Sequence, residues 1–412
     1  MITLEKIKKA SQRLENIAQK TPLAYAPILS EMSGYNVYLK KDNLQITGSF
    51  KLRGAFNKIA TLIEQGDKRG VVAASAGNHA QGVAYGAKHF GVEATIFMPE
   101  ATPLNKVQGV KSNGANVVLK GSNYDEAYSF AVDYAKENNL SFVHPFADDE
   151  VIAGQGSIAL EILSEINTLD AIVVPVGGGG LISGVAKAAK ELNPNIKVIG
   201  VAAAGAPAMA QSFKAKKALN TDSVRTIADG IAVKNTSEFT LNYILELVDD
   251  IKLVCDDEIA SAILFLLERQ KLLVEGAGAA GVAALLHKHI ELEPNSNVCI
   301  ILSGGNIDVT MLNLIIEKGL LKSYRKMKLV VTLIDKPGAL EHFSSLMREA
   351  SANIVHIGYD RTSTDLEFGD AHVSVALETK GQHHQEQIRD ILRENGYKFR
   401  EEHWCKMLLL SI

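Results

Sequence analysis

Short apolar runs alternate with longer amphipathic stretches between about residue 50 and residue 320. The runs have strand length and carry few polar side chains, which predicts strands that are buried on both faces. They cover residues 71–74, 94–98, 116–119, 171–176, 197–201 and 298–302. Between them lie stretches of helical length rich in Ala, Leu and Lys, such as residues 80–90, 124–138 and 181–192. This alternation predicts an α/β fold with parallel sheets covered by helices on both faces.

The pattern changes near residue 320. A predicted helix at residues 312–318 precedes a basic stretch over residues 323–328, which we expect to be a solvated linker. The sequence DKPG at residues 335–338 predicts a turn, because proline and glycine suit turn dihedral angles. Apolar periodicity predicts strands at residues 329–334, 354–359, 372–377 and 407–410, and helices around residues 340–350 and 388–392. The order βαββαβ predicts a small ferredoxin-like domain over residues 329–412.

Composition narrows the class of protein. The 412 residues suffice for two or three domains, and 47% hydrophobic with 22% charged residues is typical of a soluble globular protein. The net charge of −4 gives no reason to expect nucleic-acid or acidic-membrane binding. The longest uncharged run, residues 171–186, is interrupted by proline and glycine and is too short to span a bilayer. Cys255, Cys299 and Cys405 lack metal-binding spacing, so we expect free thiols and a cytoplasmic enzyme.

Two features indicate a site for a phosphorylated aldehyde. Lys51 lies in the stretch GSFKLRG, residues 48–54, and four consecutive glycines occupy residues 177–180. The glycines follow a predicted strand and precede a predicted helix, where several backbone N–H groups can bind a phosphate. No Lys-Ser or Lys-Thr pair follows them, so a nucleotide-binding P-loop is not supported. A positioned amine together with a phosphate cradle indicates pyridoxal phosphate chemistry.

Two more polar loops follow predicted strands. The sequence SAGNHAQG, residues 75–82, places small residues at a helix start and suits a carboxylate, and Asn78 can donate to a phenolic oxygen. His79 in this loop is of a kind that is more often structural than ligand-binding. The sequence SGGN, residues 303–306, follows the last predicted strand of this region. Because ligands bind at the carboxyl ends of strands in open parallel sheets, we expect these loops and the glycines to form one site.

The four motifs, in this order, resemble those of fold-type II pyridoxal phosphate enzymes. Within that group the chain is similar to threonine dehydratases over roughly residues 3–322. The resemblance implies a catalytic domain over residues 1–322, with a small subdomain of about residues 50–153 inserted into a larger one. The tail, with DKPGAL at residues 335–340, resembles an ACT domain, an amino-acid-sensing module. The implied fold is two parallel-sheet α/β subdomains followed by an ACT-like domain.

The resemblance also implies a role for each site residue. Lys51 would bond covalently to pyridoxal phosphate, and Phe50 would pack against its ring. Asn78 would donate to the 3-hydroxyl oxygen of the ring, and Ser303 would hydrogen-bond the pyridine nitrogen. The phosphate would be held by backbone N–H groups of Gly177, Gly178, Gly179, Gly180 and Leu181. The substrate carboxylate would be held by the loop that contains Ser75, Ala76, Gly77, Asn78 and His79.

The implied reaction is a β-elimination on L-threonine that yields 2-oxobutanoate and ammonia. The amine of Lys51 would remove the Cα proton as general base, and the cofactor would delocalise the resulting charge. A neutral serine cannot protonate the pyridine nitrogen, which favours prompt loss of the β-hydroxyl over racemisation, with the cofactor phosphate as the candidate acid. Serine dehydratase or racemase activity, β-replacement, and a non-catalytic amino-acid sensor are the alternatives.

The acidic residues give less information than the loops. Related racemases and some dehydratases carry an acidic metal ligand after the strand at residues 197–201, but this chain has AAAGAPA at residues 202–208. We therefore expect no metal site. Asp229 is interpreted as a loop-capping carboxylate. Glu275 is either a residue on the cofactor side or a satisfied buried carboxylate.

Regulation is expected in the tail. Gly338 lets a ligand or a partner backbone approach closely, and Asn353 and Ile354 open the strand that faces it. The hypothesis is an amino-acid effector at an interface between two such domains, and the alternative is a plain dimerisation domain. The resemblance implies a homo-oligomer, either a tetramer or a dimer. Isoleucine biosynthesis and threonine catabolism are both open, as is the preference for threonine over serine.

Overall fold

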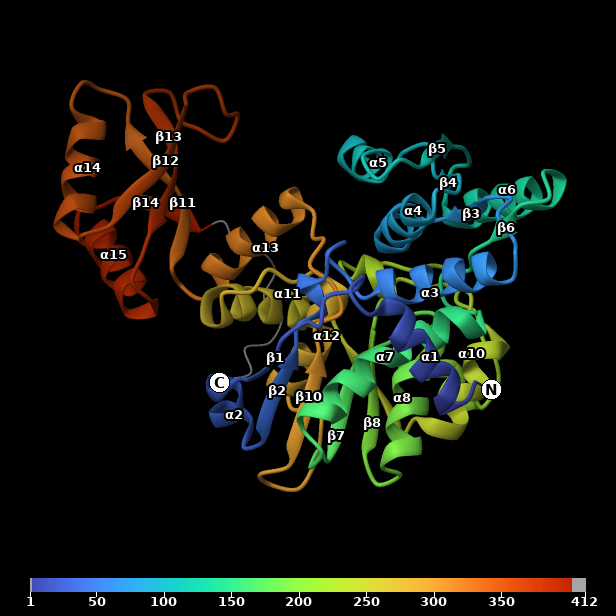
Figure 1. Ribbon diagram of the computed structural model, residues 1–412. Coiled ribbons are helices and arrows are strands. Elements are labelled where there is room, and N and C mark those ends of the chain that lie inside the picture. The colour runs from blue at the N-terminus through green and yellow to red at the C-terminus, as the bar shows by residue number, and fades with distance from the viewer. Residues whose placement is uncertain (1, 402–412) are drawn as a thin grey trace. The chain divides into compact units, whose positions relative to one another are not determined.

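The computed structural model describes residues 2–401, which fall into two compact units (Figure 1). The division lies between Met311 and Leu312, within helix α13 (Val309–Lys322). The sequence had placed this boundary after a shorter helix at residues 312–318. Each unit has its own sheets and its own hydrophobic core.

In the described residues, the larger sheet of the first unit has six strands in the order β1-β2-β10-β7-β8-β9. They are β1 (Leu23–Tyr25), β2 (Asn36–Lys40), β7 (Ala171–Pro175), β8 (Lys197–Ala203), β9 (Asp250–Val254) and β10 (Asn297–Ile301). β1 runs antiparallel to β2, whereas β2, β10, β7, β8 and β9 run parallel to one another. The predictions of parallel strands at residues 171–176, 197–201 and 298–302 are confirmed.

Helices separate these strands along the chain, and several begin with a side chain that caps the first turn. They are α1 (Leu4–Leu14), α2 (Pro27–Ser33), α7 (Asp149–Glu165), α8 (Gly180–Leu192), α9 (Ala208–Ala215), α10 (Glu238–Leu247), α11 (Asp256–Phe265) and α12 (Gly276–Leu286), with helical turns η1 (Asp42–Leu44), η2 (Asp229–Ile231) and η3 (Leu266–Gln270). Thr3, Asp148 and Ser237 accept hydrogen bonds from backbone N–H groups of α1, α7 and α10. Among the described residues, no helix is both long and apolar enough to cross a membrane.

Both faces of the larger sheet are covered by helices. On β7, Ile172 and Val174 belong to the core that α7 and α8 form with the sheet. Val173 between them points to the opposite face, because side chains alternate along a strand. There it lies under α12, where a Cβ at Gly281 would be 3.3 Å from it. This layering explains why the central strands are apolar on both faces.

The smaller sheet of the first unit has strand order β5-β4-β3-β6, and its neighbouring strands are parallel. Its elements are α3 (Lys51–Glu64), β3 (Val71–Ala74), α4 (Asn78–Phe90), β4 (Ala94–Met98), α5 (Leu104–Lys111), β5 (Asn116–Leu119), α6 (Tyr124–Glu137) and β6 (Ser141–Phe142). Helices α3 and α4 approach closely because α4 carries glycines on the shared side. A Cβ at Gly82 would lie 3.0 Å from the carbonyl oxygen of Lys51, so this packing helps to place the start of α3.

The second unit is an antiparallel sheet of order β12-β13-β11-β14 with two helices. Its elements are β11 (Lys326–Ile334), α14 (Ala339–Glu349), β12 (Asn353–Asp360), β13 (Asp370–Glu378), α15 (Gln382–Glu394) and β14 (Lys398–Glu401). Phe343 of α14 and Ile388 of α15 are fully buried against the strands. The predicted order βαββαβ is confirmed.

Some predicted boundaries were wrong. β11 begins at Lys326, so half of the predicted linker at residues 323–328 is strand, since its lysines alternate with residues that face the core. The closing strand of this sheet is β14, and the apolar stretch at residues 407–410 lies outside the described residues. The sequence analysis also missed β1, β2, β6 and β9, which are short or carry charged side chains.

Candidate active site

Two loops that are distant in sequence pair directly beside the candidate lysine. Ser49 forms an antiparallel bridge with Gly304, and the backbone N–H of Phe50 donates to the carbonyl oxygen of Ser303 at 3.0 Å. Ser303 follows β10 and is buried. The pairing therefore fixes the carboxyl end of β10 next to the start of α3.

Lys51 begins α3 and turns its amine into the protein. Its Nζ donates to the carbonyl oxygen of Pro145 at 2.8 Å and lies 5.3 Å from the centroid of the Phe50 ring. Burial lowers the pKa of Lys51 to about 8, while the Glu275 carboxylate acts in the opposite direction. A useful fraction of the amine is therefore unprotonated near neutral pH, as a nucleophile or general base requires.

The amide of Asn78, the first residue of α4, is held by two partners. Its Nδ2 donates to Oε1 of Glu275 at 2.7 Å, and its Oδ1 accepts a hydrogen bond from Nδ2 of Asn306 at 2.7 Å. Asn306 is itself anchored by donation to the carbonyl oxygen of Thr47. Because an amide nitrogen carries two N–H groups, Asn78 can still donate to a bound ligand in a defined direction.

Glu275 lies on the same side of the site as Asn78. It immediately precedes α12, and its backbone N–H donates to the carbonyl oxygen of Gly304 at 3.0 Å. A Cβ at Gly304 would overlap the Glu275 carboxylate, and one at Gly230 would lie 3.3 Å from it, so two glycines make room for this side chain. Burial raises the pKa of Glu275 to about 7, against the opposing hydrogen bond from Asn78. Its carboxyl group thus changes protonation near neutral pH.

The glycine tract connects β7 to the N-terminus of α8. Gly179 has φ of 88°, a left-handed conformation that favours glycine. Cβ atoms at Gly178 or Gly180 would overlap Phe146, and the carbonyl of Gly178 accepts a hydrogen bond from Oγ1 of Thr240 at 2.8 Å. Glycine is therefore required by both conformation and close packing. The tract itself carries no side chains at the start of α8, which suits the binding of a phosphate by its backbone N–H groups.

The predicted carboxylate loop between β3 and α4 is partly exposed at Ser75, Ala76 and Gly77. Oγ of Ser75 accepts a hydrogen bond from the N–H of Gly77 at 3.1 Å, which shapes the loop. His79 differs from these residues because it is buried and its Nε2 is hydrogen-bonded to the carbonyl oxygen of Val143 at 2.8 Å. Burial lowers the pKa of His79 to about 3, so the imidazole is neutral. This contact gives His79 a structural function, and its contact with substrate stays a prediction.

Arg53, two residues after the lysine, is fully buried in a charge-balanced network. Its guanidinium donates to both oxygens of Asp42, at 2.8 and 3.0 Å, and to Oε2 of Glu161 at 3.0 Å. Lys40, also buried, donates to the same Glu161 oxygen. Two cations thus meet two carboxylates beneath the start of α3, which stabilises the helix that carries Lys51.

The sequence analysis missed part of the site. Pro145 and Phe146, in the connection from β6 to α7, contact the lysine and the glycine tract, yet no pattern singles them out. Asn306 stood in a motif that was noticed, but its contact with Asn78 was not anticipated. Among residues 2–401, no group of three His, Cys, Asp or Glu residues could hold a metal ion.

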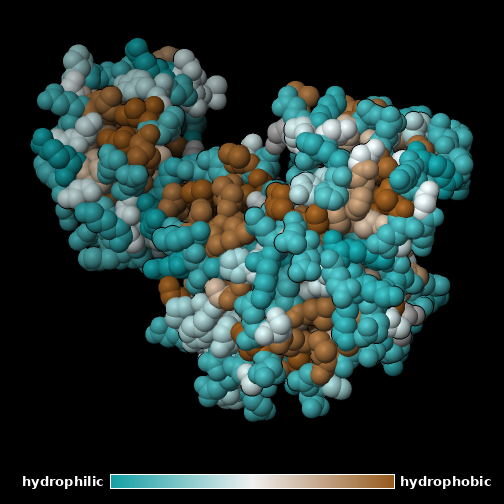
Figure 2. Space-filling model, viewed as in Figure 1, coloured by the Kyte–Doolittle hydropathy of each residue, from teal (hydrophilic) through white to brown (hydrophobic). Residues whose placement is uncertain are grey.

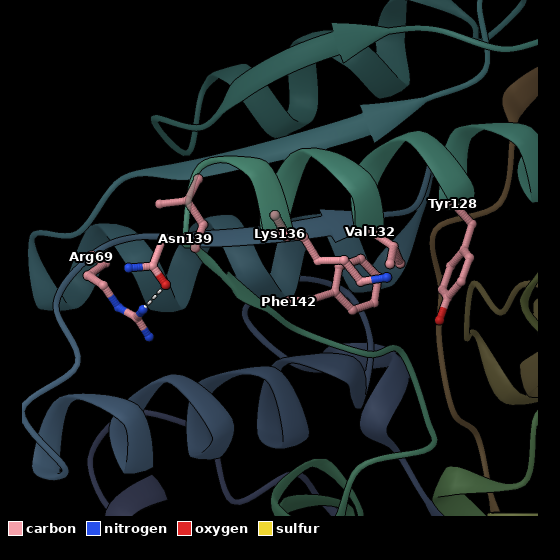
Figure 3. A pocket seen from close by; sticks show the side chains of 8 residues that line it. Arg69, Tyr128, Val132, Lys136, Asn139 and Phe142 are labelled. Atoms are coloured by element: carbon pink, nitrogen blue, oxygen red, sulfur yellow. Dashed lines mark hydrogen bonds between the residues drawn. The ribbon is translucent and has the colours of Figure 1, made fainter.

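A separate cavity of about 330 Å³ lies beside α6 and β6 (Figure 3). Tyr128 and Phe142 supply aromatic walls, and the guanidinium of Arg69 donates to Asn139 at its edge. The cavity is not lined by residues predicted for the cofactor or the substrate. It therefore does not compete with the site around Lys51.

The residues at this site fit pyridoxal phosphate. A buried amine with a lowered pKa can bond to the aldehyde, the glycine-lined start of α8 offers N–H groups to the phosphate, and the fixed amide of Asn78 offers one to the ring hydroxyl. Together with the parallel-sheet fold, this combination defines a pyridoxal phosphate-dependent enzyme. Residues 14–304 match the family model "Pyridoxal-phosphate dependent enzyme", and the chain belongs to this family.

Individual relatives agree with this assignment. The chain is 48% identical over 400 residues to the L-threonine ammonia-lyase of Thermotoga maritima, which covers 97% of this chain and 99% of the relative. The structure of maize serine racemase covers 78% of this chain and 99% of its own, with a TM-score of 0.73 and 34% identity. The processed threonine deaminase isoform 2 of Solanum lycopersicum covers 77% and 89%, with a TM-score of 0.72 and 36% identity.

Proposed function

We propose that this protein converts L-threonine into 2-oxobutanoate and ammonia. The observation that carries the proposal is the likeness, over nearly the whole length of both chains, to an L-threonine ammonia-lyase, on a fold whose described site holds a buried amine of lowered pKa. One water is lost from the β-carbon, and one water is consumed when the released enamine product is hydrolysed. The net change is therefore the loss of ammonia from the substrate.

The residues of the site have distinct tasks in this proposal, and Lys51 has two. Lys51 holds the cofactor covalently, the tract from Gly177 to Leu181 holds its phosphate, and Asn78 and Ser303 contact its ring. When bound, pyridoxal phosphate withdraws the electron pair that the departing Cα proton leaves behind. After the substrate amine has displaced Lys51 from the cofactor, the freed Lys51 amine accepts that proton, and the carbonyl of Pro145 can accept a hydrogen bond from the protonated amine.

A racemase is the second candidate, because a serine racemase has a similar structure at 34% identity. Ser303 is neutral and does not protonate a pyridine nitrogen, which supports elimination over racemisation. The test is a product assay with L-threonine and L-serine, following ammonia, keto acid and the D-enantiomer. Ammonia and 2-oxobutanoate from L-threonine support the proposal, whereas D-serine without keto acid would favour a racemase. A colourless purified protein without turnover would favour a non-catalytic sensor.

Regulation by an amino acid is proposed for the second unit, whose order of elements supports its resemblance to an ACT domain. Gly338 has φ of 87°, and a Cβ there would meet nothing within 4 Å, so its turn is open to a ligand. Asn353 instead donates to Glu378, and Ile354 packs against the core. These two residues therefore stabilise β12 and do not form the open turn at Gly338. Steady-state kinetics with and without isoleucine and valine would test this regulation and separate a biosynthetic from a catabolic role.

A homo-oligomer and a cytoplasmic location are also proposed. On the visible face of Figure 2, apolar residues gather in separate patches on a largely hydrophilic surface. On the edge strand β12, Val355, Ile357 and Tyr359 are each more than 40% exposed, and such an edge supports pairing with a second copy. Cys255 and Cys299 are free thiols, which supports a reducing compartment.

A further inference from the structure

Residues 143–147 lie in the connection from β6 to α7 and contact several parts of the candidate site. The carbonyl oxygen of Pro145 accepts the hydrogen bond from Nζ of Lys51, at 2.8 Å. Two residues earlier, the carbonyl oxygen of Val143 is hydrogen-bonded to Nε2 of His79, also at 2.8 Å. The segment therefore joins the lysine on α3 to the start of α4.

The same segment supports the glycine tract through Phe146. A Cβ at Gly180 would lie 2.9 Å from the Phe146 Cα, and one at Gly178 would overlap the Phe146 ring. The His144 imidazole stands edge-on to this ring, with centroids 4.7 Å apart, and its centroid lies 5.9 Å from that of Tyr128. Movement of this segment would therefore disturb the amine and the phosphate loop together.

The conformation of the segment depends on one ring nitrogen. Nδ1 of His144 accepts hydrogen bonds from the backbone N–H groups of Phe146, at 3.1 Å, and Ala147, at 2.8 Å. Asn, Asp and Ser use their side-chain oxygens in the same way, toward N–H groups two and three residues ahead, in turns and at helix N-caps. The imidazole can accept both bonds only while Nδ1 carries no proton.

The surroundings keep this imidazole neutral. Burial lowers the pKa of His144 to about 4, and the charge of Lys51 acts in the same direction, while Asp148 acts against both. Asp148 is itself paired with Lys58 at 2.7 Å, and His79 on α4 is a neutral neighbour. At neutral pH the ring is therefore an acceptor, and the turn is intact.

We propose that His144 is a positioning residue: its imidazole holds the turn that aims the carbonyl of Pro145 at the amine of Lys51. The free amine of Lys51 is then held in one position by its hydrogen bond to the carbonyl of Pro145, and the same carbonyl accepts a hydrogen bond from the protonated amine. The inference rests on the proposed function, because it requires Lys51 to be the reacting amine. A group misplaced by about 1 Å costs up to about 100-fold in rate, so the turn matters for turnover.

The first test measures the amine without the cofactor. Cofactor-free protein is labelled with acetic anhydride at a series of pH values, and mass spectrometry follows acetylation of Lys51. The wild-type midpoint is expected near the Lys51 pKa of about 8. His144→Phe keeps an aromatic ring, somewhat larger than imidazole, but loses the acceptor. The carbonyl of Pro145 then no longer stabilises the charged amine, and the midpoint falls by about one unit.

The second test measures turnover of the loaded enzyme. His144→Phe is expected to lower kcat for L-threonine about 10- to 100-fold with a smaller change in KM. His144→Asn is expected to restore both kcat and the acetylation midpoint toward wild type, because its amide oxygen can accept the same two N–H groups. His89→Phe, at an exposed histidine of α4 that packs on Phe56, is the matched control and is expected to leave both values unchanged.

Three outcomes would overturn the inference. His144→Phe could match wild type in both measurements, His144→Asn could fail as badly as His144→Phe, or the midpoint could rise toward the ordinary lysine value of about 10.4, which would indicate an exposed amine. If His144→Phe does not fold, His144→Asn alone tests the inference, which requires its kcat and acetylation midpoint to stay near those of wild type. A shifted midpoint in a protein that does not deaminate threonine would instead count against the proposed function alone.

Discussion

Lys51 and Arg53 are two cations two positions apart on the same helix, but Lys51 is half-buried, Arg53 is fully buried, and their partners differ. Arg53 donates to two carboxylates, those of Asp42 and Glu161, which raise the pKa of its guanidinium although burial opposes them. Lys51 donates to a neutral carbonyl, and burial lowers the pKa of its amine to about 8 despite the charge of Glu275. One cation is fixed as a charge, and the other can give up its proton.

The difference shows how a short stretch of sequence combines support with reactivity. A buried charge is tolerated when ionic partners surround it, and such a group is inert. A buried amine without a close carboxylate shifts its pKa toward neutrality, which is a mark of functional lysines. Arg53 thus holds α3 in place so that Lys51 can be both buried and free to react.

The largest effect should come from Lys51→Ala. Turnover of L-threonine is expected to fall by about 10³-fold or more, because both the covalent anchor and the base are lost. The free energy of unfolding of the cofactor-free protein should change by no more than about 1–2 kcal/mol, since the Lys51 side chain makes one hydrogen bond to a carbonyl. Kinetics and urea unfolding check the two parts. Activity near that of wild type would refute the assignment of Lys51.

Arg53→Met should show the opposite pattern, with its main effect on stability. The substitution removes the cation that pairs with the carboxylates of Asp42 and Glu161. The unpaired negative charge should lower the free energy of unfolding by about 3–5 kcal/mol. Arg69→Met is the control, because Arg69 pairs with Asp67 at the surface, and it should cost much less stability than Arg53→Met. Equal losses in urea unfolding would show that the buried network is not what distinguishes Arg53.

Gly178→Ala tests the close packing of the phosphate loop. The new methyl group would overlap the Phe146 ring, so we expect a loss of about 1–3 kcal/mol in stability and weaker cofactor retention. Gly109→Ala in α5 is the matched control, because a Cβ there meets nothing within 4 Å and helix propensity favours alanine. Visible absorbance after dialysis measures retention. If Gly178→Ala retained the cofactor fully, the phosphate loop would be shown to accommodate a methyl group beside Phe146.

The last prediction concerns Glu275→Gln and the pH dependence of stability. The folded-state pKa of Glu275 is about 7, above its ordinary value of 4.5. Between these pH values the folded protein keeps a proton that the unfolded chain has released, so the Glu275 contribution to the unfolding free energy falls as pH rises. In cofactor-free Glu275→Gln that fall should be absent. An unchanged difference between the unfolding free energies at pH 5 and pH 7 would contradict the raised pKa.

The elements of the site could be predicted from the sequence because of the parallel sheets. β7 and β10 run parallel in one sheet, so the loops after them lie at the same edge. The loop after β3 belongs to the smaller sheet, and the close packing of α4 on α3 brings it next to Lys51. Lys51 was recognisable because its own segment, GSFKLRG, is distinctive. The role of each residue in these segments came from the resemblance to a known enzyme family.

The contacts that tune the site could not be predicted in this way. Lys51 and Pro145 are 94 residues apart, and Asn78 and Glu275 are 197 residues apart, so both contacts depend on how distant elements pack. β2 was missed for a related reason. It ends at Lys40, which is buried only because Glu161 on α7 neutralises it, and a lysine in isolation indicates a surface.

The central claim is that Lys51, and not another lysine, carries the cofactor. It is tested most directly by loading the protein with pyridoxal phosphate, reducing it with borohydride, and locating the modified lysine by peptide mass spectrometry. The account predicts the reduced cofactor on the peptide that contains Lys51, and its absence in Lys51→Ala. Stoichiometric modification of a different lysine, or retention of the label in Lys51→Ala, would contradict it.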